Sequence, residues 1–267
     1  MELSIILPTY NEGRNLSDLI PKLEDSIKDH VDRFEILVVD ENSQDSTNEV
    51  LKNLQDTYKN IKFIVRKAEP SLPLSIYEGI LKADYDFVMW LDADGSMTPD
   101  AVVALIKRQK LNFDDVIIGS RFVEGGGYKG VEPNSQKNIF KTFRNIYKSE
   151  DSILAVTLSK LFNIFLNYIM KSDIKDMTSG FIIGKKNLFK GDRIYKCFQD
   201  AEYGEYFTFL INELQNKNIK LIEVGYICAT RVHGVSKTGT NYRQLIKRGI
   251  PYLLTAYKIR YENEKNK

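Results

Sequence analysis

Asp92 and Asp94 are the residues of this sequence with the clearest chemical potential. They lie two residues apart, directly after the apolar run FVMWL at residues 87–91. Alternation along an extended chain directs both carboxylates to one side, where like charges repel unless a cation lies between them. Mg²⁺ or Mn²⁺ suits such a pair, because hard cations take carboxylate oxygens and keep positions for substrate phosphates. An Asp-x-Asp triplet also occurs in ordinary solvated turns, so the preceding strand is what favours a metal site.

Asp40 and Glu41 form a second acidic pair, after the apolar run FEILVV at residues 34–39. Carboxylates at such a strand end can accept hydrogen bonds from a ribose or from a base N–H, as in other doubly wound nucleotide sites. They can also cap the next turn, where Asn42, Ser43 and Asp45 follow. The two roles are compatible.

The composition limits the remaining chemistry. The chain has 267 residues, with only two histidines and two cysteines. Histidine-rich and cysteine-based metal sites are therefore excluded, and the unpaired spacing of Cys197 and Cys228 indicates a reducing compartment. A net charge of +2 argues against a nucleic-acid partner. Catalysis must use carboxylates, hydroxyls, lysine, arginine or an oxygen-ligated metal.

The elements that must position these residues alternate along the first 120 residues. Strand patterns occupy residues 3–7, 34–39, 61–65, 87–91 and 116–119, and helical patterns occupy 15–28, 47–58, 74–83 and 99–110. This alternation predicts an α/β fold, a mainly parallel sheet with helices on both faces. Ligands of such sheets bind outside the carboxyl ends of the strands. The polar residues expected there are 9–12, 40–41, Arg66, 92–94 and 120–121.

The second half is less regular. A glycine-rich loop at 124–135 precedes a helical region at 138–170, a strand at 181–184, a helix at 203–216, a strand at 219–228, a polar loop at 231–240 and a basic helix at 242–261. The helical patterns at 154–168 and 242–261 are amphipathic, and we expect them to lie either at a membrane interface or on the protein core. No signal peptide and no uninterrupted apolar run of about 18 residues is found. We therefore expect a cytoplasmic protein, or one peripheral on the inner face of the membrane.

Three segments together resemble the successive motifs of the family 2 glycosyltransferases, which have the GT-A (Rossmann-like) fold. They are IILPTYNE at 5–12, VVDENSQDST at 38–47 and DADGSMTPD at 92–100. GSRF at 119–122, DMTSGF at 176–181, EV at 223–224 and RVHGVSK at 231–237 resemble the branch related to dolichol-phosphate mannosyltransferase. The resemblance implies a catalytic domain over 1–240, with an acceptor or interface segment at 125–172. A C-terminal basic amphipathic helix and tail would follow over 241–267.

The resemblance also implies an activity: inverting transfer of a mannose- or glucose-type hexose from GDP-mannose or a UDP-hexose to a polyprenyl phosphate, with Mg²⁺ or Mn²⁺ as cofactor. Asp92 and Asp94 would hold the metal. The nucleotide sugar would contact Pro8, Tyr10, Glu12, Asp40, Arg66, Asp92, Ser179, Ser236 and Lys237. The acceptor would contact Ser120, Arg121, Arg144 and Lys160. Direct participants in catalysis would be Asp94, Arg121, Arg231 and, for a hydroxyl acceptor, Glu202 or Glu205.

The sequence departs from the branch at several positions. Ser96 stands where a metal-associated Gln is usual, Glu41 replaces Asp, and Gly225 replaces Pro. Ala155 aligns with a second phosphate-binding Arg, for which Arg144 or Lys160 would have to substitute. These departures affect the sugar donor and the lipid acceptor more than the fold.

The residues leave three possibilities open: transfer to a lipid phosphate, transfer to a glycan hydroxyl, or no catalysis. A phosphate monoester has a second pKa of about 6, so it is ionised near neutral pH and needs cations rather than a base. A glycan hydroxyl, as in surface polysaccharide synthesis, needs a carboxylate base, and Glu202 and Glu205 are the candidates. These acids can equally stabilise a helix N-terminus. The third possibility is a non-catalytic subunit that binds a sugar nucleotide, which Ser96 and Ala155 would favour.

Overall fold

A seven-stranded sheet forms the centre of the molecule in this computed structural model, which describes residues 1–128, 153–234 and 242–265. The strand order is β3-β2-β1-β4-β7-β5-β8. The strands are β1 Glu2–Thr9, β2 Arg33–Asp40, β3 Ile61–Val65, β4 Phe87–Trp90, β5 Val116–Ser120, β7 Ile182–Lys185 and β8 Leu221–Gly225. Strand β7 is antiparallel to its neighbours β4 and β5, and the other pairs are parallel. The predicted mainly parallel α/β sheet is confirmed.

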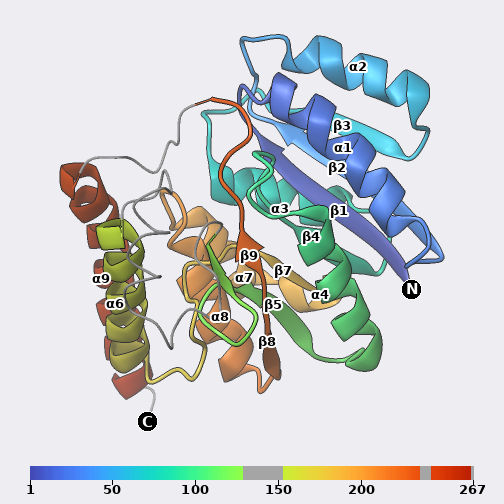
Figure 1. The fold of residues 1–267 in the computed structure, drawn as a ribbon. Coiled ribbons are helices and arrows are strands. Elements are labelled where there is room, and N and C mark those ends of the chain that lie inside the picture. Colours follow the sequence, from blue (N-terminus) through green and yellow to red (C-terminus); the bar gives the residue numbers. More distant parts are fainter. Residues whose placement is uncertain (129–152, 235–241, 266–267) are drawn as a thin grey trace, which may run out of the picture.

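Helices cover both faces of the sheet (Figure 1). They are α1 Gly13–Ile27, α2 Thr47–Thr57, α3 Leu72–Lys82, α4 Pro99–Leu111, α6 Ile153–Met170, α7 Asp192–Gln199, α8 Tyr206–Asn216 and α9 Tyr242–Lys265, with the short 3₁₀ helix η2 at Lys186–Phe189. Side chains of β1 alternate between the faces: Ile5 packs with α1, α2 and α4, whereas Ile6 packs with α3 and the later helices. The sheet therefore separates two apolar cores.

Several elements in the second half differ from the sequence prediction. Helix α8 begins at Tyr206 rather than Tyr203, because the Glu205 carboxylate accepts backbone N–H groups of Glu202 and Tyr203 and holds a turn. The strand expected at 219–228 is divided into β8 and β9 Ile227–Cys228 at Tyr226. There the chain changes partners, and β9 pairs with β6 Gly127–Tyr128 in a separate two-stranded sheet. Helix α7 was not predicted.

The amphipathic segments are helical where they are described. Helices α6 and α9 pack against each other, and α9 also packs against α8. Within the described residues, none of the helices combines the length and apolar character needed to cross a bilayer.

Candidate active site

The loop after β4 carries Asp92 and Asp94 to the carboxyl edge of the sheet. Asp94 Oδ1 accepts a hydrogen bond from the Ser96 backbone N–H at 2.9 Å, which orients this carboxylate. The Asp94 side chain is 21% exposed, so its second oxygen remains within reach of a ligand. Ser96, which replaces the usual Gln, therefore contributes its backbone to the position of Asp94.

A segment from the far end of the chain crosses this loop. Ala229 N–H donates to the Ser96 carbonyl at 2.8 Å, and Val232 N–H donates to the Asp94 carbonyl at 3.3 Å. Next in the chain, His233 exchanges hydrogen bonds with the Asn15 side chain at the start of α1. Residues 229–233 thus form a strap that connects the β4 loop to α1.

Arg231 is the charged centre of the strap. Its guanidinium donates to both carboxylate oxygens of Glu12, and its Nη1 lies 3.5 Å from Asp94 Oδ2. Asn15 supports Glu12 with a hydrogen bond of 2.6 Å. Three predicted site residues, Glu12, Asp94 and Arg231, are therefore brought into one ionic cluster.

Asp92 has a strongly perturbed pKa. Asp92 is an exposed residue, although the surrounding protein partly desolvates its carboxyl group. Desolvation is the main cause that raises its pKa to about 7, and repulsion by Asp94 and Glu12 adds to it. Arg121 and Arg231 act in the opposite direction. The carboxylates of Glu12, Asp92 and Asp94 therefore carry more negative charge than Arg121 and Arg231 balance.

The residues present fit a divalent cation. Asp92 and Asp94 provide hard oxygen donors, and Mg²⁺ typically binds through one or two carboxylates while substrate phosphates and water complete its shell. The described residues contain no group of three or more His, Cys, Asp or Glu arranged to hold a metal. A cation here would thus depend on this pair together with the ligand phosphates.

A second polar group lies at the ends of β2 and β3. Asp40 is fully buried, and its carboxylate accepts hydrogen bonds from the backbone and the hydroxyl of Ser43. Next to it, Glu41 pairs with Arg66 at 2.5 Å, and Arg66 also binds Glu78 of α3 at 3.0 Å. The second oxygen of Glu41, Oε2, is buried with no hydrogen-bond partner. Asp40 therefore shapes the loop, whereas Glu41 retains an unused acceptor.

Arg121 follows β5 and is rigidly held. Its Nε and Nη2 bind the two oxygens of the buried Asp176 at 2.8 and 2.7 Å, and Nη2 also donates to Thr178 at 2.8 Å. Its guanidinium lies over the rings of Phe122 and Tyr128. Burial alone would lower the pKa of Arg121, but Asp176 more than offsets this and raises it. Sequence reasoning missed the contact with Asp176, although Asp176 opens a motif that it noted.

Helix α6 is tied to this arginine. The buried Asn163 accepts from the Met177 N–H at 2.8 Å and donates to Thr178 Oγ1 at 3.1 Å. Thr178 Oγ1 in turn accepts from Arg121. The position of α6 is therefore coupled to that of Arg121 through two side chains.

The other predicted residues are distributed unevenly. Ser120 and Ser179 are buried, and their hydroxyls bond to backbone groups of neighbouring residues. Glu205 is also buried by its turn, whereas Glu202 and Lys160 are exposed. Pro8 is buried in β1, and Tyr10 is exposed at its end. Arg144, Ser236 and Lys237 lie outside the described residues.

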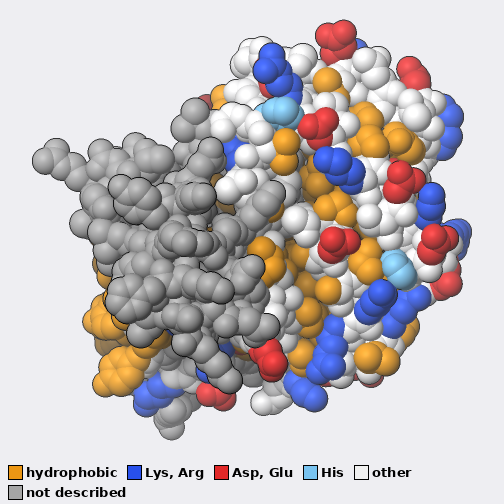
Figure 2. Space-filling model, in the orientation of Figure 1, with side chains coloured by type: hydrophobic (Ala, Val, Ile, Leu, Met, Phe, Trp, Pro, Cys, Tyr) orange, Lys and Arg blue, Asp and Glu red, His pale blue; other side chains and the backbone are white. Residues whose placement is uncertain are grey.

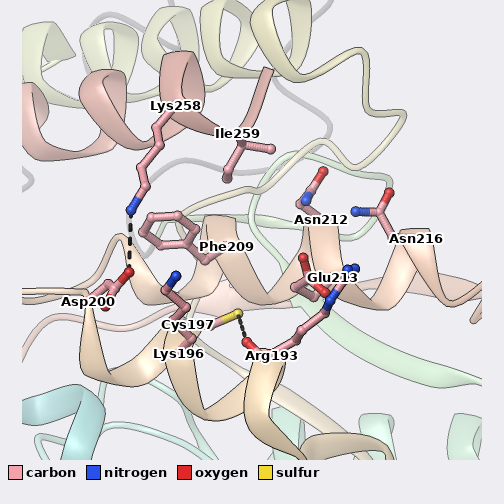
Figure 3. A pocket seen from close by; sticks show the side chains of 10 residues that line it. All are labelled: Arg193, Lys196, Cys197, Asp200, Phe209, Asn212, Glu213, Asn216, Lys258 and Ile259. Carbon is pink, nitrogen blue, oxygen red and sulfur yellow. Dashed lines mark hydrogen bonds and ion pairs between the residues drawn. The ribbon is translucent and has the colours of Figure 1, made fainter. Parts of the chain in front are cut away.

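A cavity of about 320 Å³ lies elsewhere, between α7, α8 and α9 (Figure 3). Arg193, Lys196 and Lys258 line it together with Asp200 and Glu213. Lys258 pairs with Asp200 at 3.3 Å, so the positive charges that line the cavity are partly compensated. None of its lining residues comes from a strand end, and the cavity is distinct from the acidic cluster.

Comparisons with known proteins agree with this fold. Residues 4–191 match the family model described as glycosyl transferase family 2, and the chain belongs to this family. A dolichol-phosphate mannosyltransferase from Pyrococcus furiosus is 30% identical over 239 residues, which cover 89% of this chain and 59% of that protein. The chain thus spans less than two thirds of that relative. The Saccharomyces cerevisiae dolichol-phosphate mannosyltransferase is 27% identical over 192 residues, 71% of each protein.

Solved structures show the same fold at low sequence identity. Glucosyl-3-phosphoglycerate synthase from Mycobacterium tuberculosis, crystallised with Mn²⁺, UDP and phosphoglyceric acid, gives a TM-score of 0.62 at 13% identity. The match covers 97% of this chain and 78% of that one. The GT-A fold implied by the sequence motifs is confirmed.

Proposed function

We propose that this protein is a metal-dependent, inverting glycosyltransferase that moves a hexose from a sugar nucleotide to a polyprenyl phosphate. The observation that carries the proposal is the ionic cluster of Glu12, Asp94 and Arg231 beside Asp92 at the carboxyl edge of the sheet. Family membership supports the reaction class, and the two mannosyltransferase relatives support mannose as the sugar. GDP-mannose is accordingly the leading donor, and a UDP-hexose is the alternative.

The donor would lie along the ends of β1, β2 and β4. Glu41 offers its free oxygen to an N–H or O–H of the nucleoside, and Arg66 fixes the orientation of that carboxylate. Asp92 and Asp94 would hold the Mg²⁺ or Mn²⁺ ion, which when bound supplies positive charge that stabilises a departing diphosphate. Arg231 lies 3.5 Å from Asp94, and it would add charge-assisted hydrogen bonds to the diphosphate oxygens.

The acceptor would lie beside β5. A phosphate oxygen forms the new bond to the anomeric carbon while the bond from that carbon to the nucleoside diphosphate breaks. The acceptor phosphate is already ionised near neutral pH, so no proton has to be removed. Arg121 is oriented for this position, but Asp176 balances much of its charge. A further cation is therefore needed, and Lys160 and Arg144 remain the candidates.

The hydroxyl-acceptor alternative would use Glu202 or Glu205 as the base. The Glu205 carboxylate is buried, and its oxygens are already occupied by the backbone N–H groups of Glu202 and Tyr203. This arrangement favours the phosphate acceptor. The proposed location is cytoplasmic, with peripheral attachment to the inner face of a membrane.

The test is a transfer assay on the purified protein. GDP-mannose and UDP-glucose would each be supplied with a short, water-soluble polyprenyl phosphate, with and without Mg²⁺ or Mn²⁺. We expect metal-dependent transfer to the phosphate, and a loss of at least about 100-fold in D94N, since removing one group that stabilises a transition state electrostatically typically costs about 2.7–4 kcal/mol. Transfer to a glycan but not to the lipid phosphate would contradict the proposal that the acceptor is a polyprenyl phosphate. Donor binding without transfer to either acceptor would indicate a non-catalytic subunit.

A further inference from the structure

The surface drawn in Figure 2 mixes acidic, basic and apolar side chains, whereas an aromatic cluster lies in the interior next to β4. Its centre is Trp90, the last residue of β4 and the only tryptophan of the sequence. The indole N–H of Trp90 donates to the hydroxyl of Tyr206, the first residue of α8, at 3.0 Å. Both side chains are at most 2% exposed. This hydrogen bond joins the strand that leads to Asp92 with a helix 116 positions further along the chain.

Neighbouring rings fix the orientation of both partners. Tyr206 stacks on Phe198 of α7 with a centroid distance of 5.2 Å and an interplanar angle of 24°. Phe189 and Phe198 meet the Trp90 ring edge to face, at 5.0 and 6.4 Å. An indole N–H that is buried without an acceptor costs about 1–3 kcal/mol. The packed rings and the hydrogen bond therefore hold Trp90 and Tyr206 in one arrangement.

At one end, the pair reaches the proposed metal-binding loop. Only Leu91 separates Trp90 from Asp92, and Leu91 is itself held, because it is buried and its N–H donates to the Ile6 carbonyl of β1 at 3.3 Å. Burial raises the pKa of the Tyr206 hydroxyl, the hydrogen bond from Trp90 opposes this increase, and the negative charge of Asp92 adds to it. The hydroxyl therefore stays neutral and lies within the electrostatic reach of Asp92.

At the other end, the pair reaches the segment at residues 176–181, whose first residue binds Arg121. A Cβ at Gly180 would lie 3.5 Å from the Tyr206 hydroxyl oxygen, so this oxygen packs against the segment. Thr208, also in α8, donates to a backbone carbonyl of the same segment at 3.2 Å. Helix α8 is therefore tied both to the metal-binding loop and to the arginine proposed for the acceptor.

We propose that Tyr206 is a positioning residue, which through Trp90 holds the Asp92 loop at a fixed distance from Arg121. In the proposed function the donor lies on the side of Asp92 and the acceptor on the side of Arg121. Transfer requires the reacting atoms to approach within about 3–3.5 Å, and a misplacement of about 1 Å can slow a reaction about 100-fold. The role in transfer rests on the proposed function, whereas the link between the two sides does not.

The variant Y206F tests the link, because it removes a single oxygen atom. We expect kcat to fall about 10–100-fold, since the reacting groups are no longer aligned. The KM values for donor and acceptor should stay within about twofold, because the ligand contacts themselves are kept. Y77F is the matched control: Tyr77 of α3 also contacts the Phe198 ring, at 5.3 Å, but its hydroxyl is not the acceptor of the Trp90 N–H. It should have the kcat and KM of the wild type.

A double-mutant cycle separates the hydrogen bond from general packing. W90F removes the donor, and W90F/Y206F removes donor and acceptor together, so that neither is left buried and unpaired. If the hydrogen bond carries the effect, the double variant should be no slower than the slower of the two single variants. A loss in the double variant equal to the product of the two single losses would assign the effect to packing and overturn the proposal.

Hydrogen exchange provides a readout that needs no transfer. Mass spectrometry would follow the exchange of residues 202–209 with and without GDP plus Mg²⁺. We expect the nucleotide and metal to slow this exchange in the wild type and in Y77F, because the link transmits order from the Asp92 loop to α8. In Y206F the exchange should not respond, although calorimetry should show the wild-type affinity for GDP plus Mg²⁺.

The proposal is wrong if Y206F keeps the wild-type kcat and the exchange response, or if Y77F shows the same losses. It is also wrong if kcat and KM both worsen in Y206F while exchange becomes faster throughout the chain, because Tyr206 would then only stabilise the fold. The proposed function fails separately, if the wild type transfers no sugar although GDP plus Mg²⁺ slows exchange at residues 202–209 and Y206F abolishes this response.

Discussion

Arg231 should affect the binding of both the metal ion and the nucleoside diphosphate. Its contacts to Glu12 and Asp94 place a positive charge beside the proposed metal ligands. In R231Q that charge is lost, so Mn²⁺ binding without nucleotide should tighten by about fivefold, the effect of roughly 1 kcal/mol between charges near water. Binding of a nucleoside diphosphate with Mn²⁺ should weaken by about 10–100-fold, because charge-assisted hydrogen bonds contribute about 1.5–3 kcal/mol. Calorimetric titration measures both.

R231K is the control for Arg231, because it keeps the charge and loses the planar guanidinium with its several donors. It should resemble the wild type in Mn²⁺ binding and lie between the wild type and R231Q in nucleotide binding. If R231Q weakens both affinities together, Arg231 only holds the strap in place, and the electrostatic account is wrong.

The reactivity of Cys197 reports on the packing of the apolar core that also contains Ile6. It is 3% exposed, and burial is the main cause that raises the pKa of its thiol to about 12. Because only the thiolate is nucleophilic, alkylation of Cys197 by iodoacetamide at pH 8 should be roughly 1,000-fold slower than in the unfolded chain. Peptide mass spectrometry over time measures the rate, and the same reaction in guanidinium gives the reference. Rapid labelling in the native protein would show that α7 and α8 open readily.

At the scale of single residues, the sequence named candidate site residues but not the contacts that their side chains make. Asp92, Asp94 and Arg231 were identified from residue type and motif. The ion pair of Arg121 with Asp176 was not, because the two residues are 55 positions apart and no local pattern encodes their meeting. The Glu205 contact is local, but the helical pattern that begins at Tyr203 places this residue inside a helix and does not indicate the turn that engages its carboxylate.

Helix α3 provides a prediction at the scale of an element. Alanine usually stabilises a helix relative to glycine by about 1 kcal/mol, but a Cβ at Gly79 would lie 2.4 Å from Ile6 Cγ2 of β1. G79A should therefore lower the free energy of unfolding, by about 1–3 kcal/mol for such overpacking. Gly249 of α9 is the matched control, because its Cβ would meet Phe162 at an ordinary 3.5 Å. Urea denaturation measures both variants, and a stabilised G79A would contradict the close approach of α3 to β1.

Elements with a strong local signal were predicted well, and elements defined by tertiary contacts were not. The strand at Ile61–Val65 has the predicted bounds, because its apolar run is complete and isolated. Helix α7 is only eight residues long, and its stripe of Ile194, Cys197 and Phe198 is too short to separate from a turn. The position of β7 between β4 and β5 depends on a long connection that no local pattern fixes.

At the scale of the whole molecule, the site joins the two ends of the chain. Glu12 and Arg231 are separated by 219 positions, yet their ion pair closes the strap over the β4 loop. Neither half of the chain can form the site alone, because the acids come from the first half and Arg231, which pairs with Glu12 and Asp94, comes from the second. Ligand binding should therefore stabilise the fold as a unit.

Thermal unfolding tests whether ligand binding stabilises both halves of the chain together. A ligand present at 100 times its Kd stabilises the native state by about 2.7 kcal/mol, which corresponds to a rise in Tm of about 5–10 °C for a domain of this size. We expect such a single, cooperative shift with a nucleoside diphosphate plus Mn²⁺, a much smaller one with either alone, and little metal dependence in D94N. Comparing GDP with UDP under identical conditions also ranks the two bases at the Glu41 edge. An equal shift without metal would contradict the use of Asp92 and Asp94 as ligands. Two separate transitions, of which only one responds, would show that the strap does not couple the halves, because a ligand that both halves hold must stabilise both.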